Sequence, residues 1–359
     1  RRPPRSTPKP SSAASDVYKR QNKQGPFLMT KTFKALESVK TDQGNQLSII
    51  ERSIDDLPEG ELLIKVHYSS LNYKDALSAT GAPGVTRNYP HTPGIDAVGI
   101  IEESSNSNFK EGDSVIVTGY DLGMNTSGGF GEYIRVPSSW AVNLPSGLSE
   151  KDSMSLGTAG LTAGLSIKAL DDFNSKRGFE SSASIVTGST GGVGSIAVML
   201  LSKLGSTVTA VTGKDSQNDL LKGLGASEII SREQLSEVSR TPIGKTIWDF
   251  GVDVVSGNIL TLLLASLKPG GAVACSGLVG GPSFESSIFP FILRGNALLG
   301  VDSVEIPIEK KMEVWENFAT DWKLDLSSLV KEVKLEELED EISTILAGGQ
   351  VGRVVVNLN

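Results

Sequence analysis

The chain has 359 residues, which exceeds the usual size of a single hydrophobic core and predicts two domains around a shared cleft. A net charge of −8 and a pI near 5.1 argue against a nucleic acid or an anionic membrane as the partner. The longest uncharged apolar run, residues 259–267, is too short to cross a bilayer. Cys275 is the only cysteine, which excludes an internal disulfide and a multi-cysteine metal site and suits the cytoplasm.

Residues 1–28 are basic and rich in Ser and Pro, without the apolar core of a secretory signal. The stretch that begins at Met29 is typical of a native start, whereas residues 12–21 resemble a translated adaptor. We therefore expect residues 1–28 to be a non-native or disordered leader. A transit peptide is the alternative.

From residue 29 to residue 152 the sequence alternates short apolar stretches with turns that contain Gly and Pro. Strands are predicted at residues 62–68, 97–101 and 114–118. A turn such as Phe109–Asp113 separates two of them. This pattern predicts a β-rich, barrel-like module.

After Met154 strands and helices alternate, which predicts parallel strands joined by crossover helices. Six strands are expected, at residues 184–187, 207–212, 228–230, 252–256, 272–276 and 297–301, with the clearest helices at 195–204 and 258–267. They predict an α/β fold with one doubly wound sheet over residues 153–301. The acidic tail from residue 302 is expected to be helical and to return to the first module with residues 352–357, so that 29–152 and 302–359 form one domain.

The strongest motif is Gly188–Gly194, a glycine-rich turn between an apolar strand and a helix. A dinucleotide diphosphate needs close backbone approach, free amides and the positive end of a helix, and glycine at these positions permits all three. Ser189 stands where the usual motif has its first glycine. The predicted contacts are Ser189, Thr190, Gly191, Gly192 and Val193.

The end of the second strand distinguishes the two nicotinamide cofactors. NAD sites usually carry a carboxylate there for the ribose 2′-hydroxyl, but this chain has Thr212, Gly213 and Lys214. A hydroxyl, a compact turn and a cation suit the 2′-phosphate of NADPH. Asp215 follows directly, and a solvated turn is the alternative interpretation of Lys214.

Several stretches together resemble one enzyme family. They are residues 69–77, 93–96, 157–163, 290–294 and 300–304. The chain from Met29 nearly to its end is similar to the quinone oxidoreductase branch of the medium-chain dehydrogenase/reductase superfamily, and within it to the acrylyl-CoA reductase subfamily. The resemblance implies a GroES-like catalytic domain, an inserted Rossmann domain, NADPH as the cofactor and a homodimer.

The resemblance also implies that the enzyme works without zinc. Zinc alcohol dehydrogenases of the superfamily carry their metal ligands at positions that align with Asn72, Ile95 and the neighbourhood of Thr158, and none of these is a normal zinc ligand. Without a Lewis acid, reduction of an activated double bond is favoured over oxidation of a simple alcohol. The expected reaction is reduction of a small enoyl-CoA, most of all acrylyl-CoA to propionyl-CoA.

Such a reaction needs an oriented nicotinamide, stabilisation of a thioester enolate and a proton. Asn72 and Tyr73 are the candidate catalytic residues beside the nicotinamide, because an amide can fix a carbonyl and a phenol can donate a hydrogen bond or a proton. The resemblance favours Tyr73 as a cofactor contact. A half-buried structural tyrosine is the alternative.

Other candidates are placed less directly. Thr158 is a predicted cofactor contact, with a helix start as the alternative, and Gly277, Leu278 and Val279 follow the fifth strand at the ligand edge of the sheet. Three arginines are candidates for the phosphates of NADPH or coenzyme A, with ion pairing as the alternative. They are Arg353 for the cofactor, and Arg87 and Arg294 for the substrate.

His67 and His91 are the only histidines and are expected to be structural, which leaves little support for a hydrolase triad or a histidine metal site. The charged run 331–341 is expected to be a solvated helix face. Two other functions stay open. One is reduction of quinones or general enones with the same cofactor, and the other is a non-catalytic crystallin-like or RNA-binding role.

Overall fold

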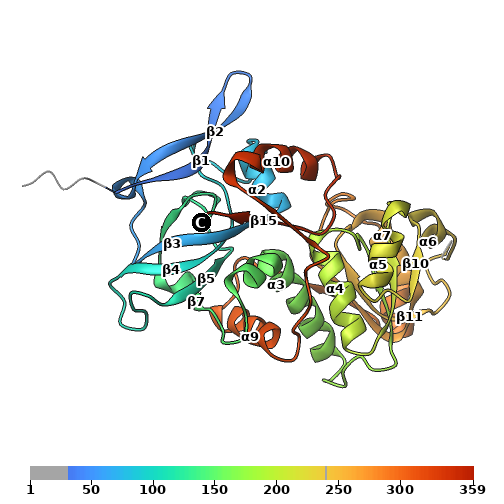
Figure 1. Ribbon diagram of the computed structural model, residues 1–359. Helices are drawn as coiled ribbons and strands as arrows, with labels where there is room; N and C mark the ends of the chain where they lie inside the picture. The colour runs from blue at the N-terminus through green and yellow to red at the C-terminus, as the bar shows by residue number, and fades with distance from the viewer. Residues whose placement is uncertain (1–30, 239–240) are drawn as a thin grey trace, which may run out of the picture.

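The computed structural model describes residues 31–238 and 241–359, so the predicted leader 1–28 lies outside the described residues. Two sheet-containing lobes lie on either side of helices α3 (Glu150–Phe173) and α4 (Gly192–Lys203), as Figure 1 shows. The α/β class and its two domain types are confirmed. Within the described ranges no helix is both long enough and apolar enough to span a bilayer.

The catalytic lobe is built on a seven-stranded sheet with the order β14-β15-β3-β4-β5-β7, in which β6 also pairs with β3. A separate hairpin of β1 and β2 packs beside this sheet. The bounds of these strands are β1 Thr32–Thr41, β2 Gly44–Ser53, β3 Leu62–Leu71, β4 Asp96–Ser104, β5 Ser114–Thr118, β6 Tyr133–Val136, β7 Ala141–Asn143, β14 Val330–Val333 and β15 Arg353–Asn357. Because β15 lies antiparallel to β3, the end of the chain is part of this lobe.

The nucleotide lobe contains the predicted six parallel strands, in the order β10-β9-β8-β11-β12-β13. They are β8 Ala183–Val186, β9 Thr207–Val211, β10 Glu228–Ile230, β11 Trp248–Asp253, β12 Leu267–Cys275 and β13 Ala297–Gly300. The helices of this lobe besides α4 are α5 Asn218–Gly223, α6 Arg232–Val238, α7 Gly257–Ser266 and α8 Phe289–Arg294. The chain order reverses between β8 and β11, and doubly wound sheets bind ligands at this point.

The fourth strand was predicted at residues 252–256, but it runs from Trp248 to Asp253 and so ends three residues earlier. The Asp253 carboxylate accepts hydrogen bonds from the backbone amides of Val255 and Ser256, which turns the chain out of the sheet. Ser256 then adopts a left-handed φ of 67°. The apolar residues 254 and 255 therefore belong to a loop at the carboxyl edge of the sheet.

Helix α3 joins the two lobes and packs against strands of both sheets. It is kinked at Gly157, whose φ of 51° and ψ of −155° are not helical. Beyond the kink, buried residues such as Leu161 share a core with Leu200 of α4 and Trp315 of α9 (Ile308–Ala319). The kink therefore lies where the chain passes from one lobe to the other.

The prediction for the charged run 331–341 was wrong over its first half. These residues form the end of β14, the short 3-10 helix η4 (Leu335–Glu337) and the start of α10 (Leu338–Leu346). Edge strands tolerate charged side chains, and β14 carries Lys331 and Glu332 at the edge of its sheet. Lys331 forms an ion pair with Glu341 of α10.

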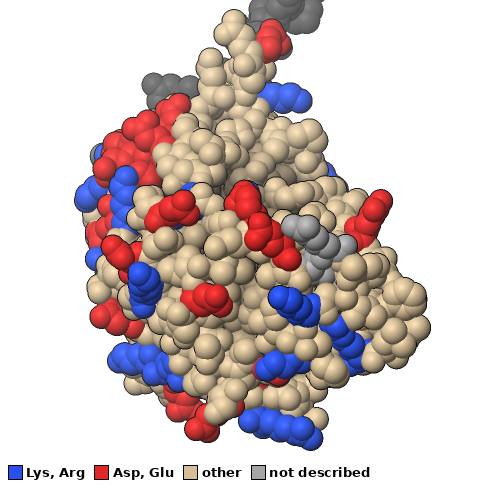
Figure 2. All heavy atoms as spheres, turned by 90° about the vertical axis from the view of Figure 1, so that its right-hand side faces the viewer, with Lys and Arg blue, Asp and Glu red and all other residues tan. Residues whose placement is uncertain are grey.

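On the face that Figure 2 shows, acidic and basic side chains are interspersed among wide uncharged areas. A phosphate polymer would require a coherent basic surface. The view presents none on this face.

Candidate cofactor and active site

The glycine-rich turn connects β8 to α4, and its backbone has the geometry that the motif predicts. Gly188 adopts a φ of 57°, and a Cβ added at Gly194 would lie 2.3 Å from the carbonyl oxygen of Gly188. Gly191 is the N-cap of α4 and leaves the amides of the first helical turn without a partner inside the helix. The partial positive charge of this helix end favours an anion.

Ser189 makes hydrogen bonds within the nucleotide-lobe sheet. Its hydroxyl donates to the carbonyl of Val186 and accepts from the amide of Val211, and its own amide donates to the carbonyl of Val211. The side chain is buried and holds β8 against β9. It therefore shapes the turn from behind and does not line the adjacent pocket.

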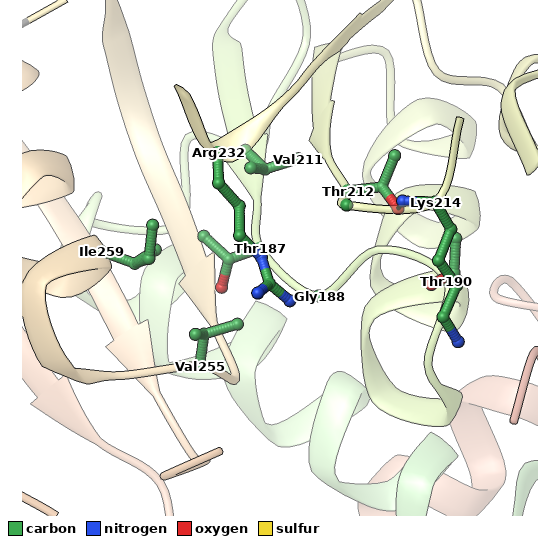
Figure 3. Close-up of a pocket in the computed structure, with 10 residues that line it drawn as sticks. Thr187, Gly188, Thr190, Val211, Thr212, Lys214, Arg232, Val255 and Ile259 are labelled. Carbon is green, nitrogen blue, oxygen red and sulfur yellow. Dashed lines mark hydrogen bonds between the residues drawn. The ribbon is translucent and has the colours of Figure 1, made fainter. Parts of the chain in front are cut away.

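A pocket opens at the carboxyl edge of β8 and β9, beside the turn (Figure 3). Its lining includes Gly188 and Thr190 from the predicted glycine-rich turn and the predicted segment Thr212–Lys214. The complete lining is Thr187, Gly188, Thr190, Val211, Thr212, Gly213, Lys214, Arg232, Val255 and Ile259. Of the five predicted diphosphate contacts, Thr190 thus lines the same cavity as the residues predicted for the 2′-phosphate.

Two cations line this pocket. In Figure 3 the Arg232 guanidinium reaches toward Thr187 and Gly188, while Lys214 lies on the other side, next to Thr190. The Lys214 ammonium donates a 2.8 Å hydrogen bond to the backbone oxygen of Gln350. Burial, and then repulsion from Arg232, lower the pKa of Lys214. An anion between the two cations would relieve this repulsion.

Arg232 was not among the residues predicted from the sequence to bind the cofactor. It is the first residue of α6 and lies just after β10, so it enters the pocket from the third strand of the sheet. A Cβ at Gly213 would lie 3.6 Å from the Arg232 Cζ, so the guanidinium packs directly against the Thr212–Lys214 turn. A signal existed in the sequence, because a cation follows the predicted third strand at the ligand edge.

Tyr73 is the first residue of α2 (Tyr73–Ala79), and 45% of its surface is exposed. Its hydroxyl makes no hydrogen bond to any residue in the described ranges. The alternative of a half-buried tyrosine with a satisfied hydroxyl does not fit these observations. Its phenol is therefore available to a ligand.

Asn72 is hydrogen-bonded at both ends of its side-chain amide. Its side-chain oxygen accepts from Nη1 of Arg353 at 3.2 Å, and its Nδ2 donates to the carboxylates of Asp96 at 2.7 Å and Asp75 at 3.2 Å. Only 8% of the residue is exposed. Because both ends of the amide are engaged, Asn72 organises the site from within and does not present a free amide to a substrate.

Asp96 is the centre of this buried network. Its carboxylate accepts from the Ser70 hydroxyl at 2.5 Å, from the Thr158 amide at 2.9 Å and from the Thr158 hydroxyl at 2.6 Å. Asp96 therefore caps the second half of α3, which restarts at Thr158 after the kink. Thr158 begins this second half of the helix, as the alternative of a helix start predicts, and its hydroxyl donates within the protein.

Asp75 lies beside Asp96 and is fully buried. Burial, and then the nearby Asp96, raise the pKa of Asp75 to about 7, while the amides of Asn72 and Ile95 donate to its carboxylate and oppose that rise. Asn72, Ile95 and Thr158 thus donate hydrogen bonds to two buried aspartates. Within residues 31–238 and 241–359, no group of three or more His, Cys, Asp or Glu could hold a metal ion.

The predicted arginines occupy three different environments. Arg353 is 2% exposed, and its guanidinium is hydrogen-bonded within the protein. Arg294 donates to the backbone oxygens of Gly244, Ala265 and Leu267, so its donors hold the chain around α7. Arg87 is exposed, and its side chain makes no hydrogen bond to a described residue. Of these three arginines, only Arg87 has a guanidinium without a hydrogen bond to a described residue.

The loop 277–279 follows β12 at the predicted edge. Gly277 lies so close to the next loop that a Cβ would meet the Val254 oxygen at 2.1 Å, while Leu278 and Val279 are exposed. Burial, and then Asp253, raise the pKa of Cys275 to about 11, so the thiol stays protonated at neutral pH. His67 contacts Glu150, and His91 is buried.

Comparisons with known proteins agree with this architecture. Residues 58–146 match the family model described as "Alcohol dehydrogenase GroES-like domain", and residues 192–320 match the model described as "Zinc-binding dehydrogenase". The two models thus fall on the catalytic and the nucleotide lobes respectively.

Individual relatives cover nearly the whole chain. The "Putative quinone oxidoreductase YhfP" of Bacillus subtilis is 43% identical over 92% of this chain and 100% of the relative, and a crystal structure of that protein with NAD bound superposes with a TM-score of 0.88. Acrylyl-CoA reductase AcuI of Ruegeria pomeroyi is 40% identical over 90% of this chain and 96% of the relative. A crystal structure of YHDH from Escherichia coli K-12 with bound NADPH is 38% identical, covers 90% of this chain and 100% of that chain, and has a TM-score of 0.86.

These relatives share both lobes with this chain and exceed the identity at which a family assignment is secure. The chain therefore belongs to the medium-chain dehydrogenase/reductase superfamily and is an oxidoreductase of that superfamily.

Proposed function

We propose that the enzyme reduces the carbon-carbon double bond of a small enoyl-CoA with NADPH, most of all acrylyl-CoA to propionyl-CoA. The observation that carries this proposal is the similarity over nine-tenths of the chain to an acrylyl-CoA reductase. In the balanced reaction, acrylyl-CoA, NADPH and a proton give propionyl-CoA and NADP⁺. Hydride reaches the β-carbon and the proton reaches the α-carbon.

The preference for NADPH rests on the pocket beside the glycine-rich turn. The crystal structures of two similar proteins contain different cofactors, NAD in one and NADPH in the other. In this chain Lys214 and Arg232 line the pocket, and the pocket lining includes no Asp or Glu. A 2′-phosphate would neutralise the two cations, whereas a ribose hydroxyl would leave them uncompensated.

The remaining cofactor contacts follow from the same placement. The amides of Gly191, Gly192 and Val193 would bind the diphosphate at the start of α4, with Thr190 beside them. Bound NADPH would supply the hydride, and Tyr73 with the loop 277–279 would orient its nicotinamide end. Binding is a better role for Tyr73 than acid catalysis, because its exposed hydroxyl has no basic or acidic neighbour bonded to it.

Arg87 is the candidate for the phosphates of coenzyme A. It lies in an exposed loop after α2, and its backbone amide donates to Asn125 of the neighbouring loop, which fixes the base of the side chain. A cation on a surface loop suits a substrate whose phosphates stay near solvent. Arg294 is unsuited to this role, because its guanidinium is hydrogen-bonded to backbone oxygens.

We also propose that the enzyme is a cytoplasmic homodimer that pairs through β13. This strand, Ala297–Gly300, lies at the edge of its sheet and contains no charged residue. Beside it, apolar side chains of and around α8 are exposed, namely Phe284, Ile288, Phe289, Ile292 and Leu293. A second copy related by a two-fold axis would pair β13 with β13 and cover this surface.

Steady-state assays with NADPH and three acceptors test the substrate assignment. Acrylyl-CoA is expected to give the highest kcat/KM, followed by crotonyl-CoA, with a small quinone lowest. A quinone that exceeds both thioesters would establish the quinone oxidoreductase alternative, which the name of the Bacillus subtilis relative favours. Salt-dependent RNA binding without oxidation of NADPH would instead support a non-catalytic role.

A further inference from the structure

The tail segment Gln350–Arg353 lies against the cofactor pocket at three points. Gln350 accepts from the Lys214 ammonium, and the amide of Gly352 donates a 2.9 Å hydrogen bond to the backbone oxygen of Thr190. A Cβ added at Gly192 would lie 3.1 Å from Cδ and Nη1 of Arg353. One short segment of the catalytic lobe therefore contacts both the 2′-phosphate side and the diphosphate turn.

The other side of Arg353 faces the end of β3. Its guanidinium donates to the Ser70 hydroxyl at 2.9 Å, to the Leu71 oxygen at 3.3 Å and to the Asn72 side chain at 3.2 Å. Its Nε donates to the Ser155 oxygen at 3.1 Å, two residues before the α3 kink at Gly157. Asn72 is the N-cap of α2 and immediately precedes Tyr73.

The planar guanidinium is suited to this position. Its donors point in several fixed directions at once, whereas the three donors of a lysine ammonium could not reach all of the same acceptors. The carboxylate of Asp96, 4.0 Å from Nη2, balances the buried charge. Arg353 thus ties β15, β3 and α3 together directly behind the first residue of α4.

We propose that Arg353 is a positioning residue that sets the distance between the diphosphate-binding turn and Tyr73. The proposal rests on the proposed function, because it assigns the diphosphate to α4 and the nicotinamide to Tyr73. NADPH spans these two points, so a shift of the turn relative to α2 moves the hydride donor away from the acceptor carbon. Misplacement by about 1 Å can cost on the order of 100-fold in rate.

Two variants test the proposal, and a third is the matched control. Arg353→Lys keeps the positive charge but loses the planar set of donors of the guanidinium. Ser70→Ala removes the hydroxyl that links Arg353 to Asp96. Ser69→Ala is the control, because Ser69 is equally buried on the same strand but its hydroxyl donates to the Asp96 backbone oxygen. All are assayed well below their melting temperatures.

The measurements are kcat with NADPH, the Kd of NADPH by fluorescence, and the Kd of adenosine 2′,5′-bisphosphate by calorimetry. The bisphosphate occupies only the nucleotide half. We expect Arg353→Lys to lower kcat about 10- to 100-fold and to weaken NADPH binding, with a smaller change of the same kind for Ser70→Ala. Bisphosphate affinity should stay at the wild-type value, and Ser69→Ala should behave as wild type.

Wild-type kcat and NADPH affinity in both folded variants would overturn the proposal, since a structural role would lower only the melting temperature. An equal loss of affinity for NADPH and for the bisphosphate would overturn it too, because Arg353 would then act on the phosphate site itself. If Arg353→Lys does not fold, Ser70→Ala against Ser69→Ala decides. If the wild type reduces no thioester or quinone, the proposed function fails, while the two affinities still decide the role of Arg353.

Discussion

Nη1 of Arg353 lies 3.2 Å from Oδ1 of Asn72, so the last strand of the chain fixes the residue that precedes Tyr73. The same Asn72 amide donates to Asp96 and Asp75 through Nδ2. The Asn72 side chain thus lies between the Arg353 guanidinium and the carboxylates of Asp75 and Asp96 in the interior. Its chemistry as an amide, with one acceptor end and one donor end, matches these partners.

Asn72→Asp should unfold the protein more easily. The change replaces the donor to Asp96 and Asp75 by a third carboxylate in a buried cluster that contains one arginine. We expect the free energy of unfolding at pH 7 to fall by about 3–5 kcal/mol in chemical denaturation. Asn108→Asp is the control at an exposed site and should change it by less than about 0.5 kcal/mol. A stable Asn72→Asp variant that loses only kcat would instead return Asn72 to a direct catalytic role.

Tyr73→Phe should weaken cofactor binding. The phenol is exposed and has no partner among the described residues, so its loss costs a ligand hydrogen bond worth about 0.5–1.5 kcal/mol. We expect a rise of roughly 2- to 12-fold in the Kd of NADPH by fluorescence titration, with an unchanged pH profile of kcat. Tyr68→Phe on β3 is the control. Unchanged kcat and cofactor affinity would remove both roles that were considered for Tyr73.

Lys214→Glu and Arg232→Glu should each discriminate against NADPH. Either change places a carboxylate next to the expected 2′-phosphate, so we expect KM for NADPH to rise about 10-fold or more while KM for NADH changes little. Lys222→Glu makes the same substitution at an exposed site outside the pocket lining and should have no effect. Equal losses with both cofactors would place the two cations outside the 2′-phosphate site.

Lys311 should make stability depend on pH in the alkaline range. Burial lowers its pKa to about 8 from 10.5, although its Nζ donates to the backbone oxygens of Thr118 and Val304. Between these two values the unfolded chain binds more protons than the folded one, so folding is favoured as the pH rises. The stability of the wild type relative to Lys311→Met, measured by urea denaturation, should therefore increase from pH 8 to pH 10. A constant difference would show that the folded-state pKa is not lowered.

Ile292→Glu should dissociate the proposed dimer. The side chain is exposed on α8 beside the β13 edge, and a charge there would be buried without a partner in the dimer. Light scattering after size exclusion should report a monomer. Met312→Glu changes an exposed apolar residue on α9 and should remain dimeric. A wild-type monomer at the same concentration would contradict the proposal outright.

The sequence alone determined the fold class, the six parallel strands and the glycine-rich turn. These features depend on local periodicity and on positions where only glycine fits, such as Gly188 and Gly194, and both signals are present in short stretches of the chain. The cation at Lys214 was predicted for the same reason, because it follows a strand at a fixed place in the motif.

Only the tertiary structure decided which polar side chains are free and which are used. Asn72, Thr158 and Arg353 look available in the sequence, but contacts across as many as 283 residues of chain bring them around Asp96 and consume their hydrogen bonds. Arg232 is the opposite case. The sequence did not single it out, but the tertiary structure places it in the lining of the cofactor pocket. Long-range packing sets these environments, and no local pattern in the sequence records which partners a buried polar group will meet.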